Sequence, residues 1–135
     1  MEKLLVDTNI VIDLLSKREE FFQEAQELFT LADNNEVVLF VSALTFANTH
    51  YLLAKYQKLD EARKTLIKFK VLVNVAALDD KIVELALVSD FKDFEDAIQY
   101  HTALENEVDI IITRNKKDFK NSKLPVMTAK EYLKK

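Results

Sequence analysis

Three aspartates close to runs of apolar residues are the side chains in this sequence best suited to chemistry. Asp7 follows Lys3–Val6, Asp118 comes shortly after Asp109–Thr113, and Asp96 opens an amphipathic stretch before that second run. Carboxylates that lie close together repel one another, and a Mg²⁺ or Mn²⁺ ion removes that penalty by taking their oxygens as ligands. Such an ion lowers the pKa of a bound water and offsets the charge of a phosphate. The pattern therefore favours metal-assisted hydrolysis of a phosphate ester.

The composition of the chain removes most other kinds of catalytic site. Among the 135 residues there is no cysteine, which excludes disulfides, thiolate zinc sites and cysteine nucleophiles. There is no glycine either, which excludes glycine-rich phosphate loops and the dinucleotide-binding fingerprint. The two histidines, His50 and His101, are too few for a three-histidine zinc site. Oxygen ligands for a hard cation remain.

Length, charge and hydropathy set further limits. A chain of 135 residues that is 49% hydrophobic can form one core, so we expect a single domain over residues 1–135. A net charge of −4 argues against broad, tight binding of nucleic acid. No apolar stretch reaches the ~18 residues of a membrane span, and Met1–Leu15 lacks the features of a signal peptide. We therefore expect a cytoplasmic protein with no membrane contact.

The order of apolar segments predicts an α/β fold with a parallel sheet. Continuously apolar runs of strand length occur at Lys3–Val6, Val37–Val41, Val71–Val75, Asp109–Thr113 and Pro125–Met127. Helical spacing is found at Ile10–Ser16 (with Thr8 or Asn9 as N-cap), Glu19–Asn34, Ala43–Gln57, Leu59–Lys68, Asp79–Val88, Asp93–Asn106 and Thr128–Lys134. Apolar strands that alternate with helices are typical of a parallel sheet, here of about five strands, with helices on both faces.

The carboxyl ends of parallel strands form the edge at which ligands bind in open α/β folds. Several polar residues follow predicted strands or open the helix that precedes one. We therefore expect convergence at this edge of Asp7, Asp96 and Asp118, with Asn48, Thr113 and Asn115 nearby.

Basic residues crowd the segment around Asp118. Arg114, Lys116 and Lys117 precede it directly. Cations next to an acidic metal site suit a phosphodiester backbone, which carries negative charge on both sides of the bond to be cut. We therefore expect these three side chains to contact the phosphate backbone of a nucleic-acid substrate.

Each of these residues also has a purely structural interpretation. The triplet Asp7–Asn9 could simply cap a helix, and Asp93 with Asp96 fits an N-cap and N3 pair. Ordinary turn, loop or exposed helix positions could account for Asn48, Asn115, Asp118 and the lysines.

Five stretches of the sequence resemble the PIN-domain family, that of the VapC-type toxins of toxin–antitoxin pairs. They are Leu5–Ile10, Val41–Thr45, Asp93–Ala97, Ile112–Phe119 and Leu124–Thr128, which span nearly the whole chain in the family's order. The resemblance implies a three-layer α/β/α sandwich and a metal-dependent endoribonuclease with a Mg²⁺ or Mn²⁺ site. It also implies homodimers that bind a small antitoxin.

The family's site residues map onto matching positions of this sequence. The resemblance implies that the catalytic residues and metal ligands are Asp7, Asp96 and Asp118, with supporting roles for Thr8, Asn48, Thr113 and Asn115. Hydrolysis would then proceed by in-line attack of water on phosphorus and leave a 5′-phosphate and a 3′-hydroxyl.

One position departs from the family's pattern. A second acid, commonly Glu, is expected on the helix after the second strand, and this sequence has Asn48 there. An amide oxygen can ligate an ion, but it brings no charge and cannot act as a general base. An alternative function is therefore a weakened or inactive PIN domain that binds RNA or a protein partner without cutting.

A second alternative is a phosphohydrolase that uses Asp7 as a covalent nucleophile. Such enzymes usually have a further Asp two positions on, and here that residue is Asn9. The sequence therefore favours this alternative less than the other two.

Overall fold

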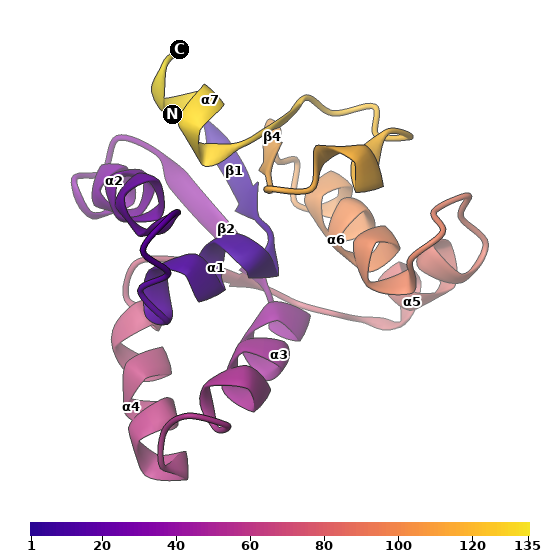
Figure 1. Cartoon of the computed structure of the whole chain (residues 1–135). Coiled ribbons are helices and arrows are strands. Elements are labelled where there is room, and N and C mark those ends of the chain that lie inside the picture. The colour runs from indigo at the N-terminus through magenta and orange to yellow at the C-terminus, as the bar shows by residue number, and fades with distance from the viewer.

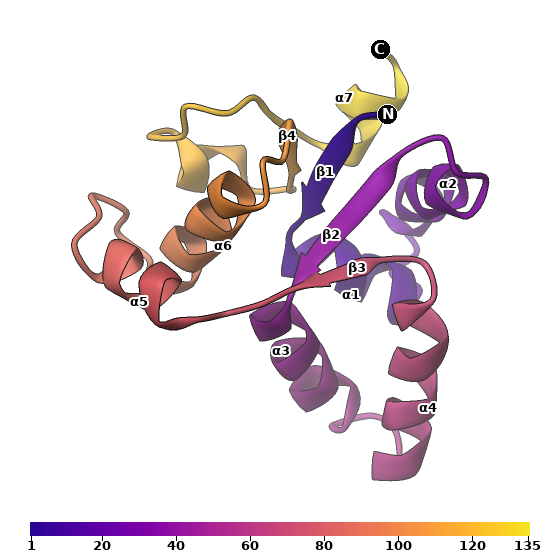
Figure 2. The same ribbon diagram turned by 180° about the vertical axis from the view of Figure 1, so that it is seen from behind.

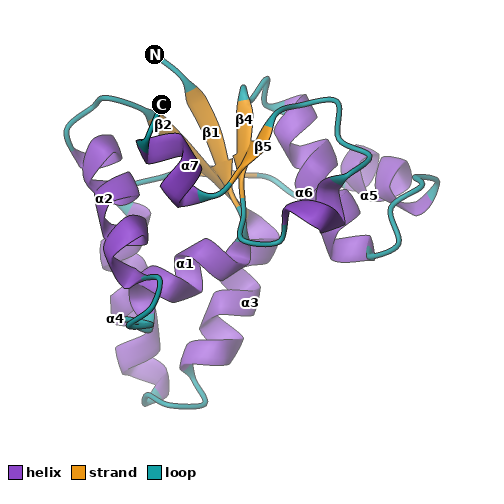
Figure 3. Cartoon of the chain, turned by 45° about the horizontal axis from the view of Figure 1, so that its top comes forward, coloured by secondary structure: helices purple, strands orange, loops and turns teal.

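A computed structural model describes all residues, 1–135, and contains one sheet of five parallel strands. The strands are β1 (Lys3–Val6), β2 (Val38–Ser42), β3 (Asn74–Ala76), β4 (Ile110–Ile112) and β5 (Val126–Met127). Their spatial order is β3-β2-β1-β4-β5, so β1 lies at the centre (Figure 3). The chain goes to one side of β1 through β2 and β3, and to the other through β4 and β5. The direction thus reverses between β1 and β4, which creates a crevice at their carboxyl ends.

Helices connect the strands and form the outer layers of the molecule (Figures 1 and 2). They are α1 (Thr8–Leu15), α2 (Phe22–Asp33), α3 (Ala43–Leu53), α4 (Leu59–Lys70), α5 (Asp80–Leu87), α6 (Phe94–Glu105), the 3-10 helix η1 (Lys116–Phe119) and α7 (Ala129–Leu133). In Figure 1, α2 lies on one side of the sheet and α5 and α6 on the other, while α3 and α4 extend beyond the carboxyl end of β2.

The alternation of side chains along the strands explains the three layers. Leu4 and Val6 of β1 point to one face, where they pack in a core formed with α1, α2, α4 and α7. Leu5 and Ile111 point to the opposite face, where they pack against α6 and Phe119 of η1. Because both faces of β1 and β4 are buried, these two runs are continuously apolar. The predicted three-layer α/β/α fold with a parallel sheet is confirmed.

Three predicted segment boundaries are wrong by three residues or more. The helix expected to begin at Glu19 begins at Phe22. The strand expected at Val71–Val75 lies instead at Asn74–Ala76, because α4 continues to Lys70 and Val71 forms its C-cap. The helix expected to reach Gln57 ends at Leu53. For the strand, one apolar stretch fits either structure, and periodicity alone does not separate them.

The sequence predicted Thr8 or Asn9 as the N-cap of the first helix. In the structure the N-cap is Asp7. The Asp7 backbone is extended, and its side chain accepts a hydrogen bond from the Thr8 backbone N–H. Asp7 therefore directly follows β1, caps α1 and contributes its carboxylate to the crevice.

No helix of the structure combines the length and the apolar character needed to span a bilayer.

Candidate active site

The crevice between β1 and β4 begins with two neighbouring residues, Asp7 and Thr113. Val6 pairs with Ile112 in the sheet, and the Asp7 backbone N–H donates to the Ile112 carbonyl at 2.9 Å. The Thr113 hydroxyl donates to Asp7 Oδ2 at 2.8 Å. Residues that lie far apart in the chain are thus fixed side by side by the parallel pairing of two strands.

Several hydrogen-bond donors lie close to the Asp7 carboxylate. Oδ1 accepts from the Thr8 backbone N–H at 2.8 Å, and the amides of Asn9 and Gln99 lie at 3.4 Å from Oδ2 and Oδ1. The residue is only 7% exposed. Burial raises the pKa of Asp7, and the negative charge of Asp118 raises it further, while the hydrogen bonds from Thr113, Thr8 and Gln99 lower it.

Asp96 lies in the first turn of α6, half-buried. Asp93 caps this helix, and its Oδ1 accepts from the Asp96 backbone N–H at 3.0 Å. Burial, followed by the charges of Asp93, Asp7 and Asp118, raises the pKa of Asp96 to about 7. The negative charges of Asp7 and Asp118, from two distant segments, therefore act on Asp96 across the crevice.

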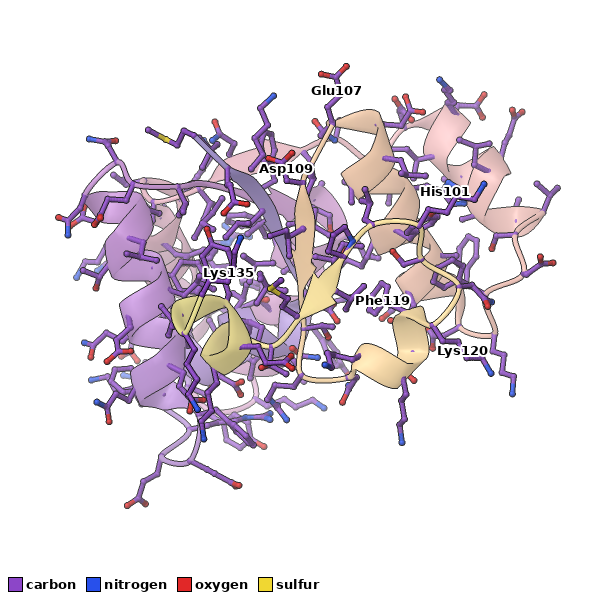
Figure 4. All side chains as sticks on the ribbon, turned by 90° about the horizontal axis from the view of Figure 1, so that it is seen from above. His101, Glu107, Asp109, Phe119, Lys120 and Lys135 are labelled. Atoms are coloured by element: carbon purple, nitrogen blue, oxygen red, sulfur yellow. The ribbon has the colours of Figure 1, made fainter.

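Asp118 lies exposed on η1 and faces a shared cavity with Asp96. This cavity has a volume of about 300 Å³ and is lined by Asp93, Asp96 and Asp118 together with the lysines Lys92, Lys117 and Lys120. Phe119 is buried against α6 and the sheet, and it anchors η1 at this position (Figure 4). The cavity thus combines carboxylates with cations, a pairing suited to a phosphate group and a counter-ion.

The donor set fits a hard cation in its chemistry. As they stand, no three of the His, Asp and Glu side chains are close enough together to hold one ion. However, the acids raise one another's pKa, a penalty that a cation would remove. In addition, the Oε1 atom of Gln99 is buried with no hydrogen-bond partner. The side chains that could hold Mg²⁺ or Mn²⁺ are Asp7, Asp96 and Asp118, and this role stays a prediction.

Three of the four supporting residues predicted from the sequence lie close to Asp7 or to one another. The hydroxyl groups of Thr8 and Thr45 are 2.8 Å apart, and the Asn115 backbone N–H donates to Thr113 Oγ1 at 3.1 Å. The Asn115 side chain is exposed. The fourth residue, Asn48, is half-buried on α3, one helical turn beyond Thr45.

The sequence analysis did not identify the buried polar residues Gln99, Thr45 and Ser42, which are linked by hydrogen bonds next to Asp7. Gln99 Nε2 donates to Thr45 Oγ1 at 2.8 Å, and Ser42 Oγ donates to the same atom at 3.2 Å. The spacing from Asp96 to Gln99 places both residues on one face of α6 and could have revealed the second. Asn9 also belongs here, because its Oδ1 accepts from the Arg114 backbone N–H at 3.3 Å.

Two of the three basic residues that were expected to contact RNA are paired within the protein. The Arg114 guanidinium donates twice to the buried Asp13, at 2.7 and 3.2 Å, and lies 4.1 Å from the centre of the Phe21 ring. Lys116 Nζ donates to Glu131 at 2.9 Å. Lys117 lines the acidic cavity. RNA contact stays a prediction for all three, and Lys117 is the best placed for it.

The fold is that of an α/β protein with a five-stranded parallel sheet and acidic residues beyond the carboxyl ends of its central strands. A sequence model of the PIN domain matches residues 3–117, and the chain belongs to the PIN domain family. Among curated proteins it is 27% identical over 139 residues to "Ribonuclease VapC1" of Aquifex aeolicus, covering 97% of this chain and 93% of that protein.

Solved structures of similar fold agree with this assignment. A toxin–antitoxin complex from Klebsiella pneumoniae contains a chain of 29% identity and TM-score 0.69, with 93% of this chain and 97% of that chain covered. The DNA-bound VapBC of Salmonella typhimurium has 16% identity and TM-score 0.72, with 96% and 99% covered. The second likeness concerns the fold alone.

Proposed function

We propose that this protein is a Mg²⁺- or Mn²⁺-dependent endoribonuclease that hydrolyses RNA phosphodiester bonds, and that it is the toxin of a toxin–antitoxin pair. One observation carries the proposal: Asp96 and Asp118 line one cavity together with lysines, and burial with the charges of Asp93, Asp7 and Asp118 raises the pKa of Asp96 to about 7. Carboxylates in this situation favour a bound cation. The similarity to a curated ribonuclease supports the choice of substrate.

Each part of the site has a role in this reaction. Asp7, Asp96 and Asp118 hold the ion, which when bound supplies Lewis-acid chemistry and neutralises negative charge. Lys117 and its neighbours in the cavity attract the phosphate backbone. In-line attack of water on phosphorus breaks the P–O3′ bond, so the products carry a 5′-phosphate and a 3′-hydroxyl.

The proposed partners are a second copy of the chain and a small antitoxin. The Klebsiella relative is described as part of a toxin–antitoxin complex. Around the α3–α4 connection, Tyr51, Tyr56 and Leu59 are 66%, 86% and 64% exposed, and large exposed apolar groups often mark interaction surfaces. Light scattering on the purified protein tests the dimer, and a monomeric mass across micromolar concentrations would contradict it.

A second candidate function is binding without cleavage. The observation in its favour is Asn48, an amide where the family commonly has an acid, together with acids that are not yet gathered around one point. An amide in place of a carboxylate weakens the attraction for a cation.

Cleavage of a mixed pool of structured RNA separates the two functions. We expect cutting with Mn²⁺ or Mg²⁺, none with chelator, and none from an Asp96→Asn variant in any buffer. An Asn48→Glu variant, which supplies the fourth acid, is expected to cut faster than the native protein. If folded native protein and Asn48→Glu are both inert with every metal, the ribonuclease proposal is overturned. If only Asn48→Glu cuts, the native chain is a binding module.

A further inference from the structure

Gln99 is a neutral side chain at the centre of the candidate active site. It is 2% exposed and lies on α6, on the same face as Asp96. Its Nε2 atom donates to Thr45 Oγ1 at 2.8 Å and lies 3.4 Å from both Asp7 Oδ1 and Thr8 Oγ1. One amide on α6 therefore contacts the end of β1, the first turn of α1 and the first turn of α3.

The hydrogen bonds around Thr45 determine which of the neighbouring hydroxyl groups donates and which accepts. Thr45 Oγ1 accepts from Gln99 Nε2 at 2.8 Å and from Ser42 Oγ at 3.2 Å. A hydroxyl oxygen accepts two hydrogen bonds and donates one. The Thr45 proton is therefore left to its third neighbour, Thr8 Oγ1, at 2.8 Å. Thr8 accepts this bond, and its own proton remains available to a ligand at its partly exposed side.

The amide carries a cost that a purely stabilising residue would avoid. Its Oε1 atom is buried with no hydrogen-bond partner. An apolar side chain of similar size, such as leucine, would fill the same space without leaving an acceptor unpaired. Compared with leucine, glutamine adds the Nε2 amide group, which lies within hydrogen-bond distance of Thr45, Thr8 and Asp7.

We propose that Gln99 is a positioning residue, whose amide fixes the donor direction of the Thr45 and Thr8 hydroxyls so that Thr8 offers its proton to a phosphate oxygen of the substrate. Without the amide, Thr45 Oγ1 has an unfilled acceptor position, and the Thr8 hydroxyl can donate inward to it instead. The identity of the acceptor as phosphate rests on the proposed function, whereas the order of the hydroxyls rests on the contacts alone.

The order of the hydroxyls is tested on metal-free protein by NMR. We expect a slowly exchanging Thr45 hydroxyl proton with a nuclear Overhauser contact to Thr8 in the native protein, and its loss in Gln99→Leu. Thr102→Val is the matched control, because Thr102 is a fully buried α6 residue whose hydroxyl also has no partner. That variant should keep the Thr45 signal. The same signal and contact in Gln99→Leu would overturn the proposal.

A double-mutant cycle in RNA cleavage tests whether Gln99 acts through Thr8. We expect Gln99→Leu and Thr8→Val each to lower kcat/KM about tenfold, as is usual for residues that support a metal site. The double variant should lose no more than either single one, because both changes remove the same donor. Additive losses of about a hundredfold would contradict the proposal. A native protein that cleaves no RNA with any metal would overturn the proposed function instead, and the NMR result would then decide the role of Gln99.

Discussion

Burial and charge act in the same direction on Asp96, the acid of α6. Its pKa is about 7 in the folded protein against an ordinary value of 3.8. Between these values the folded state binds more protons than the unfolded chain, so the free energy of unfolding of the metal-free protein falls as pH rises. The site therefore carries unfavourable charge at neutral pH, and a bound cation would remove that charge.

Asp96→Asn is expected to remove this part of the pH dependence. At pH 8, in chelator, the variant should be more stable than the native protein by on the order of 1 kcal/mol, after allowance for solvent screening of a half-exposed group. Near pH 4 the two proteins should be equally stable. Urea unfolding at pH 4, 6 and 8 measures the difference, and identical profiles would contradict the assigned pKa.

At the scale of elements, η1 presents two neighbouring lysines in different situations. Lys116 is paired with Glu131 at 2.9 Å, whereas Lys117 lines the acidic cavity. The rigid attachment of η1 through the buried Phe119 keeps this difference in place. Sequence reasoning treated the two residues as equivalent, because adjacent lysines in a loop cannot be told apart without their partners.

Lys117→Ala is therefore expected to weaken RNA binding more than Lys116→Ala. Loss of one phosphate contact to a single strand lowers the slope of log affinity against log salt by about 0.7. Fluorescence anisotropy with a labelled RNA and the Asp96→Asn protein, over a range of salt concentrations, gives the slope. Equal slopes for the native residue and for alanine at position 117 would remove Lys117 from the RNA path.

The pair formed by Asp13 and Arg114 joins α1 to the segment after β4. The Asp13 side chain is 1% exposed, and Arg114 donates to both of its oxygens. Arg114 also covers the ring of Phe21 at the start of α2. Removal of one partner leaves a buried charge unpaired, which is more costly than removal of both.

Arg114→Met, which leaves the buried Asp13 carboxylate without this partner, is expected to lower the free energy of unfolding by about 3 kcal/mol. The double variant Asp13→Leu, Arg114→Met should recover most of that loss, since no buried charge is left. Urea unfolding of the two single variants, the double variant and the native protein forms a complete cycle. A double variant as unstable as Arg114→Met would show that packing, and not charge, holds these elements together.

At the scale of the whole molecule, the candidate site joins the two halves of the sheet. Asp7 and Thr45 belong to the half formed by β1, β2 and their helices, and Asp96 and Asp118 belong to the half that contains α6, β4 and η1. A ligand held between them stabilises the folded state, because the unfolded chain has no such site.

Mg²⁺ is therefore expected to raise the melting temperature of the native protein. At a concentration a hundredfold above Kd, the gain corresponds to about 2.7 kcal/mol. Asp7→Asn should abolish most of the shift, and calorimetric titration with Mn²⁺ should show the same loss of affinity. An equal shift in both proteins would place the bound ions elsewhere on the surface.

The local pattern of this sequence determined most of the fold. Strands buried on both faces are continuously apolar, and the helices between them have clear periodicity, so the parallel α/β/α architecture followed from short-range information. The acids Asp7, Asp96 and Asp118 stood out for a similar reason, because Asp7 directly follows a strand, Asp96 lies in the first turn of a helix and Asp118 lies in the segment after a strand. The strand near Val75 was misplaced, since one apolar run there serves both the end of α4 and β3.

Only the tertiary structure decided which polar residues meet across these elements. Gln99, Thr45 and Asp7 lie on three separate elements, and nothing in their own neighbourhoods along the chain indicates that they touch. The same holds for Arg114. Its position in the chain suggested a role beside Asp118, but in the structure its guanidinium pairs with Asp13. Chain neighbours determine the local conformation of a segment, whereas the partner of a buried polar group depends on which distant segments the packed core brings beside it.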